Sequence, residues 1–571
     1  MASETRVAYF SMEIGLRTEM PTYSGGLGVL SGDTLRAAAD LGLPVVAVTL
    51  LYRQGFFRQH LAADGHQTED QPSWEPEHFL EACPQRVRLT VEGREIVLRP
   101  WLYRLKGVHG HEVPIYMLDA DLPENAPEDA SLTGQLYGGD QRYRLRQEAI
   151  LGLGGVAMLR ELGFDGLETY HMNEGHSALL TLALLYEEEP GRASGWTDPG
   201  MIASVRRRCV FTTHTPVPAG HDRFPIGLVT EVLGEEIAET IHQLPCVEGH
   251  VLNMTYLGLF FSRYINGVAH LHGQVAQALY PDYHVKSITN GVHARTWTCD
   301  AMEGLFDRRL PGWRVDGDML RRALTVPVEE VMTAHRHAKA ALLDEVFRRT
   351  GRMLDSSVMT IGFARRAATY KRADLVFGNL DNLRQIAHEA GRIQFIYAGK
   401  AHPHDEPAKD IIRRVYAARD ALQGEIPVVY LEEHDMTLGK LLCSGVDLWL
   451  NNPQRPMEAS GTSGMKAALN GVPSLSVLDG WWPEGWVEGV TGWSIGDGAG
   501  EMEDPDVERT WLHNKLSYTI LPMFYGSPES YGRVMRATIA INGAYFTAQR
   551  MLQQYINEAY ALPMEEALVS G

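Results

Sequence analysis

The stretch YSGGLGVL, residues 23–30, lies between a strand-like segment at residues 7–10 and a helical segment at residues 34–41. A second β-rich run follows at residues 45–51. A glycine loop and a helix that join two such runs are typical of a parallel α/β sheet. Glycines let the backbone approach a ligand closely, and the N–H groups at a helix N-terminus attract an anion. The stretch therefore indicates an α/β fold with a ligand beside this loop.

The same glycines have an alternative interpretation, a tight turn that needs positive φ angles. The dinucleotide-binding pattern GxGxxG is incomplete here, because Ser31 occupies the position of its third glycine. We therefore expect no NAD site in this loop.

Two series of strand-like runs divide the chain, and a less regular stretch at residues 300–326 separates them. In both halves distinctive polar residues follow the strands, where open α/β sheets bind their ligands. We therefore expect two Rossmann-like lobes that face a central cleft. The first would span residues 1–310 and the second residues 311–532, with C-terminal helices at residues 533–571 packing back on the first lobe. The runs lie at residues 45–51, 167–172 and 209–213, then at 358–363, 394–398, 428–431 and 446–450.

Composition excludes several classes of protein. The 571 residues carry 52 Lys and Arg against 72 Asp and Glu, a net charge of −20, so we expect no binding to nucleic acid. The best apolar run, residues 43–52, is too short to cross a membrane, and no secretory signal is found. Five scattered cysteines without a CxxC pair fit a reducing compartment. We expect a cytoplasmic protein with five buried thiols and no zinc finger.

A second glycine-rich element, PMEASGTSGMKAALNG, occupies residues 456–471. Its small residues predict a loop at 459–464, a helix at 465–469 and a C-cap at Asn470-Gly471. Lys466 would then lie in the first helical turn, where the helix dipole lowers the pKa of a lysine. Such a lysine suits a Schiff base with an aldehyde. The alternative is a surface lysine on an amphipathic helix.

A third element, GFARRAATYKR at residues 362–372, has four cations within eight residues directly after a predicted strand. This pattern predicts a phosphate site, with a solvated basic surface as the alternative. Histidines form a fourth element, since His171 lies at the end of a predicted strand and His176 and His214 follow predicted strands. Their spacing differs from HExxH, and we expect no metal site.

These four elements, in this order, resemble the α-glucan phosphorylases, the family of glycogen, starch and maltodextrin phosphorylases. The resemblance is strongest at EASGTSGMK, residues 458–466, where the family carries EASGTGNMK and its lysine holds pyridoxal 5′-phosphate as a Schiff base. It implies a GT-B glycosyltransferase architecture and retaining phosphorolysis of terminal α-1,4-linked glucose by inorganic phosphate, with release of α-glucose 1-phosphate. The resemblance continues over nearly the whole chain, at residues 9–13, 25–28, 52–57, 173–176, 213–215, 266–269, 289–291, 297 and 366–372.

The resemblance also implies a role for each matching residue. The implied catalytic residues are Lys466, Arg366, Lys371, His214 and Glu458. The implied cofactor-binding residues are Lys466, Gly26, Gly461, Thr462, Arg365, Lys371 and Trp297. The implied glucose-binding residues are Leu27, Glu174, His176, His214, Asn290, Tyr370, Glu458, Ser460 and Gly461. Arg366 and Lys371 would bind the attacking phosphate.

Some positions depart from the family pattern. Ser463-Gly464 replaces Gly-Asn, Arg365 stands where a lysine is usual, and Glu174 stands where an aspartate is usual. The active-site gating loop is shortened at residues 136–141, and the animal-type phosphorylation and AMP sites have no counterpart. We therefore expect a short-form enzyme without allosteric regulation. Whether it forms a homo-oligomer stays open from the sequence.

Two other functions stay open from the sequence. A nucleotide-sugar-dependent α-glucan synthase shares the two-lobed architecture, but such synthases usually carry KTGGLG where this chain has Tyr23-Ser24 before the glycines. They also lack a lysine placed like Lys466. A non-catalytic glucan-binding protein is the second alternative, suggested by the altered loop at Ser463-Gly464.

Overall fold

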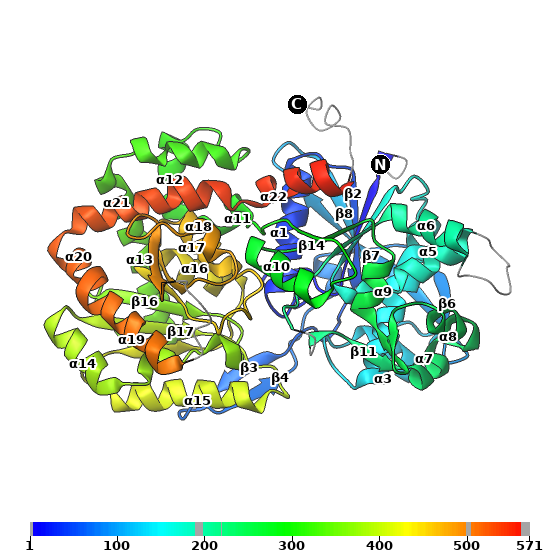
Figure 1. Cartoon of the computed structure of the whole chain (residues 1–571), viewed down its shortest axis with the longest axis horizontal. Helices are drawn as coiled ribbons and strands as arrows, with labels where there is room; N and C mark the ends of the chain where they lie inside the picture. The colour runs from blue at the N-terminus through cyan, green and yellow to red at the C-terminus, as the bar shows by residue number, and fades with distance from the viewer. Residues whose placement is uncertain (1–3, 189–197, 218–219, 498–503, 561–571) are drawn as a thin grey trace.

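The computed structural model describes residues 4–188, 198–217, 220–497 and 504–560. The chain forms a mixed α/β fold around two large sheets, which lie on opposite sides of the molecule in Figure 1. The predicted α/β class with parallel sheets is confirmed. Both sheets have strands that are buried along their whole length, which explains their continuous apolar runs.

The first sheet contains ten strands, and seven of them run parallel. Its core is the unit β1 (Val7–Ser11), α1 (Gly26–Asp40) and β2 (Val45–Leu50), in which Val7 pairs with Val45. The sheet order is β15 (Val285–Ser287), β14 (Tyr264–Gly267), β10 (Cys209–Thr212), β9 (Thr169–Asn173), β1, β2, β8 (Glu112–Asp119), β7 (Arg94–Lys106) and β5 (Glu81–Ala82), with β6 (Val87–Val91) beside β7.

The second sheet contains six parallel strands. Numbered along the chain, their order is 3-2-1-4-5-6, the order of doubly wound nucleotide-binding sheets. In such sheets ligands bind where the order reverses, here between the first and fourth strands. The order is β18 (Val428–Leu431), β17 (Ile393–Ala398), β16 (Met359–Ala364), β19 (Leu448–Asn451), β20 (Ser474–Val477) and β21 (Gly492–Ile495).

The helix after the first glycine loop and the stretch between the two series of strands differ from their predictions. Helix α1 begins at Gly26, inside the glycine loop, so that Gly28 and Gly32 lie within it. A Cβ at Gly32 would lie 2.0 Å from the Gly15 carbonyl oxygen, which shows how closely this helix packs. The stretch at residues 300–326 is helical, with α12 (Asp300–Arg309) and a 3₁₀ segment η7 (Gly317–Thr325). Its charged faces had concealed the helical pattern.

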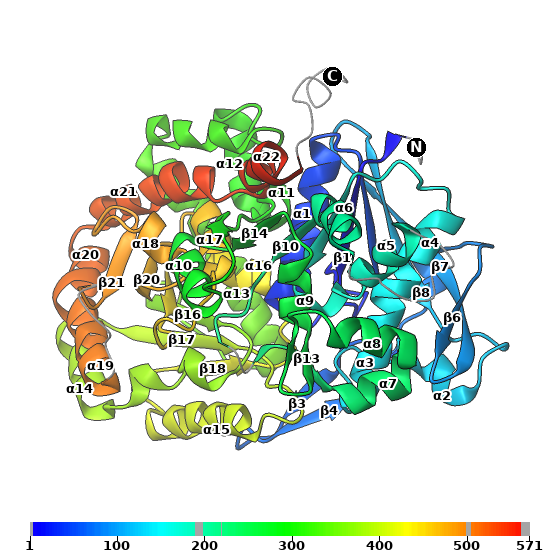
Figure 2. The same cartoon turned by 45° about the vertical axis from the view of Figure 1, so that its right-hand side comes forward.

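The C-terminal helices contact both sheets. Helix α21 (Pro528–Thr538) packs in the core of the second sheet, whereas α22 (Ala548–Tyr555) packs against α1 beside the first sheet. Figures 1 and 2 show these red helices passing from one half of the molecule to the other. The Tyr555 hydroxyl lies 3.0 Å from Thr212 Oγ1, and the Tyr560 hydroxyl lies 2.7 Å from His171 Nδ1. His171 is therefore buried between the first sheet and the C-terminal helices.

A hairpin from the first half reaches the second. Strands β3 (Arg58–Leu61) and β4 (Gln67–Asp70) lie beside α15 (Glu406–Ala421) in both views. The side-chain amide of Gln59 donates to the Gly399 carbonyl at 2.9 Å, and the side-chain amide of Gln67 donates to the Ala401 carbonyl at 2.9 Å. These bonds hold the loop that follows β17.

The expectation of five buried thiols is wrong for one residue. Cys209, Cys246, Cys299 and Cys443 are buried, but Cys83 is half-buried, because it lies near the sheet edge at β5. All five are free thiols. Among the described residues, no helix is long and apolar enough to cross a membrane.

A buried ion pair anchors β19 to the long helix α13 (Val328–Thr350). Asp447, 3% exposed, accepts from Lys339 Nζ at 2.6 Å and from the Thr360 amide at 2.7 Å. Its other oxygen lies 3.0 Å from His335 Nε2.

We predict that Asp447→Asn lowers the free energy of unfolding by about 3 kcal/mol or more, because it leaves the Lys339 ammonium buried and unpaired. Urea denaturation followed by circular dichroism measures this change. Asp381→Asn is the matched control, since the Asp381 side chain is 96% exposed in its pair with Arg384, and we expect a change below about 0.5 kcal/mol. Equal stability of Asp447→Asn and the control would contradict the prediction.

Candidate active site

One cavity of about 710 Å³ is lined by loops from both sheets. Loops after β1, β9 and β10 form one wall, and loops after β16, β17, β18 and β19 form the other. The carboxyl ends of parallel strands meet at one sheet edge, which explains why these loops converge. The cavity brings together the sixteen site residues that the resemblance implies: Gly26, Leu27, Glu174, His176, His214, Asn290, Trp297, Arg365, Arg366, Tyr370, Lys371, Glu458, Ser460, Gly461, Thr462 and Lys466. His171, by contrast, lies outside it.

The glycine loop opens onto this cavity at the N-terminus of α1. A Cβ at Gly25 or Gly26 would meet no described atom within 4 Å, and neither residue has a positive φ. The tight-turn interpretation of these two glycines is therefore wrong. A Cβ at Gly28, by contrast, would lie 2.6 Å from Tyr23 Cβ, so this glycine serves packing. The open space beside Gly25 and Gly26 leaves room for a ligand against the backbone.

Glu13, directly after β1, holds the start of this loop. Its carboxylate accepts from the Ser24 amide at 2.5 Å, from the Gly25 amide at 3.2 Å and from the Tyr137 hydroxyl at 2.9 Å. No side chain among the described residues caps α1. The amides of Gly26 and Leu27 lie in the first helical turn, where backbone donors lack acceptors within the helix and attract anions.

A second helix N-terminus lines the same cavity. Helix α17 (Thr462–Leu469) begins after Gly461, whose φ of 85° favours glycine. No side chain of the described chain caps it, and Ser460 Oγ has no hydrogen-bond partner there either. The predicted start of this helix at residue 465 is wrong, because Thr462 to Gly464 already adopt the helical conformation. Lys466 consequently lies in the second turn.

Lys466 is buried, with 9% of its surface exposed. Its Nζ lies 3.6 Å from the centre of the Trp297 ring, and none of the hydrogen bonds or ion pairs of the described residues involves it. Burial lowers the pKa of Lys466, although the charge of Asp33 raises it. The expected lowering therefore comes from desolvation and not from a place in the first helical turn.

The basic cluster surrounds one carboxylate. Glu458 accepts from Lys371 Nζ at 2.7 Å and pairs with Arg365 Nη2 at 2.6 Å, and Arg365 also donates to Asn451. Burial raises the pKa of Glu458, but the charges of Arg365 and Lys371 outweigh burial and bring it to about 2. Arg366 stays accessible to the cavity, with the Tyr370 hydroxyl beside it.

The histidine wall follows β9 and β10. His214 Nε2 lies 2.6 Å from Asn173 Oδ1, and Glu174 accepts from the His214 amide at 2.7 Å. Burial lowers the pKa of His214 to about 3 and that of His176 to about 4, so both rings are neutral at pH 7. Among the described residues, His176 Nδ1 and Asn290 Oδ1 are buried without a hydrogen-bond partner. A polar ligand in the cavity would supply one.

Sequence analysis missed several residues of the cavity wall. Lys400 and His402 follow β17, and His434 and Asp435 follow β18. Their available signal is that they are polar residues directly after predicted strands. Arg144, which lies over the Tyr137 ring at 4.5 Å, has no local signal of this kind because it comes from helix α3 (Gln141–Ala149).

The cavity is cationic in an acidic protein. Six cationic side chains line it, against four carboxylates, although the chain as a whole carries a charge of −20. The cations are Arg144, Arg365, Arg366, Lys371, Lys400 and Lys466, and the carboxylates are Glu13, Glu174, Asp435 and Glu458. A surplus of positive charge at two open helix N-termini favours anionic ligands.

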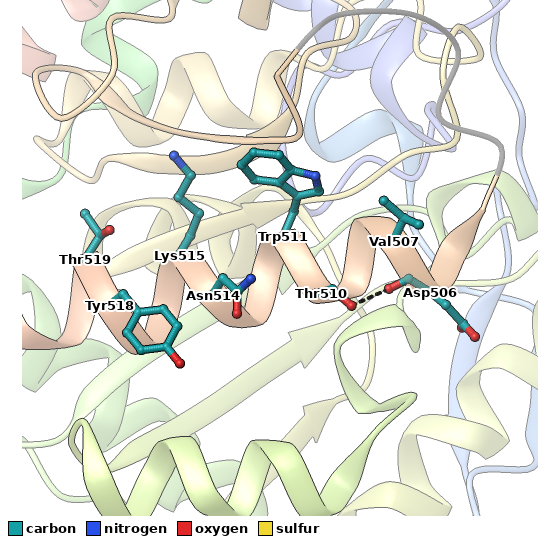
Figure 3. Close-up of a pocket in the computed structure, with 8 residues that line it drawn as sticks. All are labelled: Asp506, Val507, Thr510, Trp511, Asn514, Lys515, Tyr518 and Thr519. Carbon is teal, nitrogen blue, oxygen red and sulfur yellow. Dashed lines mark hydrogen bonds between the residues drawn. The ribbon is translucent and has the colours of Figure 1, made fainter.

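A second pocket, of about 480 Å³, lies along α19 (Pro505–Lys515) and the turn that follows. Figure 3 shows its eight lining residues on one helical segment, with Trp511 and Tyr518 pointing in different directions. Lys515 in this pocket is neutralised by Glu488. Its polar groups do not converge on a point, so the larger cavity is the candidate active site.

Because the charged form of Glu458 is stabilised by folding, this group contributes stability above pH 4.5 that is lost as the pH falls toward 2. We predict that Glu458→Gln lowers the free energy of unfolding at pH 7 by about 3 kcal/mol. In this variant the free energy of unfolding should also fall less steeply between pH 4.5 and pH 2 than in the wild type. Urea titrations at several pH values measure both effects. Glu95→Gln, which removes an exposed carboxylate paired with Arg88, should keep the wild-type pH dependence. An unchanged pH dependence in Glu458→Gln would contradict the prediction.

Comparison with known proteins agrees with this geometry. The profile of the carbohydrate phosphorylase family matches residues 223–482. The chain is 36% identical to the maltodextrin phosphorylase of Thermococcus litoralis, over 99% of this chain and 72% of that protein. It is 37% identical to the glycogen phosphorylase of Mycobacterium tuberculosis, over 98% of this chain and 71% of that protein. It is 32% identical to the glycogen phosphorylase of Aquifex aeolicus, over 98% of this chain and 87% of that protein. The chain therefore belongs to the α-glucan phosphorylase family.

Proposed function

We propose that the α-glucan phosphorylase activity of this chain takes place in the cavity between the two sheets. The chain cleaves α-glucans with inorganic phosphate. In finer terms, the terminal α-1,4-linked glucose would be released as α-glucose 1-phosphate with retained configuration. The observation that carries the proposal is the meeting of two uncapped helix N-termini, of α1 and α17, and the buried Lys466 in one cationic cavity within the described chain.

The residues present fit pyridoxal 5′-phosphate. Lys466 directs an amine of lowered pKa toward the cavity, and Trp297 offers a ring face beside it. Gly461, Thr462 and the unpartnered Ser460 Oγ stand at the N-terminus of α17, where a phosphate group would be accepted. When bound, the cofactor would supply a phosphate group that assists proton transfer to the substrate phosphate. Its covalent attachment would be to Lys466.

A second anion would bind at α1. Gly26 and Leu27 offer backbone donors there, and Arg366 offers a guanidinium that reaches the cavity. Lys371 would complete this phosphate site from its place beside Glu458. Two phosphates in one cavity repel each other, and the surplus of cations lowers that repulsion.

The glucosyl unit would bind between the histidine wall and α17. Asn290 Oδ1 and His176 Nδ1 are free to pair with sugar hydroxyls within the described structure, and the backbone amide of His214 donates to Glu174 on the same wall. Glu458 uses its two oxygens for Arg365 and Lys371, and a carboxylate accepts about four hydrogen bonds, so it retains an acceptor position for a hydroxyl. Glu458 would thus hold the sugar and would not attack it.

The reaction then follows from charge and position. The substrate phosphate gives a proton to the glycosidic oxygen, the bond from that oxygen to the anomeric carbon breaks, and a phosphate oxygen bonds to that carbon. The anomeric carbon passes through an oxocarbenium-like state, which nearby anionic oxygens stabilise. Arg366, Lys371 and the open amides of α1 keep the phosphate in reach, which converts a bimolecular step into an oriented one.

Further features of the protein belong to the same proposal. The order of the second sheet supports a GT-B arrangement of two lobes, residues 1–310 and 311–532. In the proposed C-terminal segment, residues 533–571, helix α22 lies beside the first sheet, and residues 561–571 lie outside the described structure. The unpaired thiols support a cytoplasmic location. We also propose that the chain can form a homo-oligomer, which a measurement of its mass in solution would test. The relatives reported above are named phosphorylases, which supports phosphorolysis over the nucleotide-sugar-dependent synthase.

The direct test is phosphate-dependent release of α-glucose 1-phosphate from maltoheptaose and from glycogen. We expect product only with phosphate and glucan together, and the ratio of the two rates gives the chain-length preference. Incorporation of glucose from a nucleotide sugar, without phosphorolysis, would contradict the proposal in favour of the synthase. Binding of glucan without either reaction would favour the non-catalytic alternative.

The cofactor assignment predicts one modified lysine. The purified protein, supplied with pyridoxal 5′-phosphate, should show an absorption band that borohydride removes, and peptide mapping should find the label on Lys466. Lys400, the other lysine of the cavity besides Lys371, is the internal control and should stay unlabelled. Lys466→Ala should lose both band and activity. A label on another lysine, or no uptake of the cofactor, would contradict the assignment.

Removal of Arg366 should weaken phosphate binding. We predict that Arg366→Ala lowers kcat/KM for phosphate by about 100-fold or more, because a guanidinium that binds the developing anion is lost. Initial rates at varied phosphate concentration measure this. Arg392→Ala removes the same charge from an exposed pair with Asp355 and should retain wild-type kinetics. A change of less than threefold in Arg366→Ala would argue against its role.

A further inference from the structure

Helix α1 carries a buried carboxylate behind the cavity wall, about one and a half turns beyond the glycine loop. Asp33 is fully buried at 0% exposure, and its Oδ2 accepts from Trp297 Nε1 at 2.8 Å. Its other oxygen lies 3.4 Å from Arg36 Nη1. Arg36 in turn donates to the carbonyl of Leu16 at 2.6 Å. The carboxylate is therefore held in one position by the chain beneath it.

The Trp297 indole lies between this carboxylate and Lys466. Its N–H edge faces Asp33, and its ring face lies 3.6 Å from Lys466 Nζ. The Trp297 backbone is fixed separately, since its carbonyl accepts from Asn470 Nδ2 at 2.9 Å. Asp33 is thus the polar contact that fixes the ring itself, within the described residues.

Electrostatics strengthens this arrangement. A carboxylate that accepts from the indole N–H polarises the ring and makes its face more attractive to a cation. The groups that act on Lys466 by charge are Asp33 and Arg36 from α1, Cys443 from α16 (Met436–Gly445), and His434 from the loop before it. Asp33 is the one carboxylate in that set. It opposes the burial that lowers the pKa of Lys466.

We propose that Asp33 is a positioning residue for Lys466: it fixes the Trp297 indole, whose face supports the lysine nitrogen, and so links the helix of the glycine loop to the lysine of α17. The inference rests on the role proposed above for Lys466, but its geometry does not depend on that role. Neither Asp33 nor Arg36 lines the cavity, so the contact between Asp33 and Lys466 runs through the Trp297 indole.

The test compares Asp33→Asn with Asp40→Asn. Asp40 is the matched control, because it is also a buried carboxylate of α1 and contacts the segment that precedes Trp297. Its Oδ2 lies 2.7 Å from His293 Nε2. Competitive acetylation of the full-length protein across pH, read by mass spectrometry of the Lys466 peptide, reports how readily this amine loses its proton. Where pyridoxal 5′-phosphate occupies Lys466, the pH dependence of the absorption band replaces this readout.

We expect Asp33→Asn to move the pH midpoint of Lys466 downward, with labelling about threefold faster at a fixed pH below the midpoint. Asp40→Asn should keep the wild-type midpoint. Equal midpoints in Asp33→Asn and the wild type, or equal shifts in the two variants, would overturn the proposal. If borohydride finds no cofactor on Lys466, the cofactor assignment fails while this measurement still decides the role of Asp33.

Trp297→Phe provides a second variant if Asp33→Asn does not fold. It keeps an aromatic face and removes the N–H donor, so Lys466 should shift in the same direction as in Asp33→Asn. In the double variant, Asp33→Asn should add less than it does alone, because the two residues act in one chain. Additive effects, or a Trp297→Phe variant with the wild-type midpoint, would overturn the proposal.

Discussion

Parallel strands bring their carboxyl ends to one edge of a sheet, and the cavity of this protein depends on that constraint. Most loops of the cavity wall follow such a strand, from Glu13 after β1 to Glu458 after β19. Helices can then begin at the same edge, as α1 and α17 do. The two sheets together present two open helix N-termini to one volume, an arrangement that suits two phosphate groups.

Charge balance explains how so many cationic side chains can line one cavity. Six cationic side chains lie close together in the cavity, and a carboxylate at the centre of the cluster offsets part of their repulsion. Glu458 joins Arg365 and Lys371 and leaves Arg366 accessible. Lys466 has no carboxylate partner among the described residues, and the Trp297 face takes that place. The cavity thus separates cations that are neutralised by the chain from those that a ligand would neutralise.

Much of the site was accessible from the sequence, because strand ends and glycine loops have local signatures and because the motifs there resemble those of a known family. All sixteen predicted site residues line the cavity, and most predicted strands begin or end within two residues of the observed ones. The start of α17 was misplaced because Thr462, Ser463 and Gly464 have weak helix propensity, which tertiary contacts override. Residues such as Arg144 could not be found, since a helix far along the chain brings them to the wall.

The sequence by itself determined the α/β class, the two glycine loops and the residue types of an anion site, since these depend on neighbours in the chain. Only the tertiary structure decided which groups are paired, and therefore which charges are open. Asp33 shows the difference: it reads as a polar residue in a helix, yet it is fully buried beneath Trp297, 264 positions away. Burial and contacts between distant segments set the pKa of Lys466, and no local pattern encodes either of them.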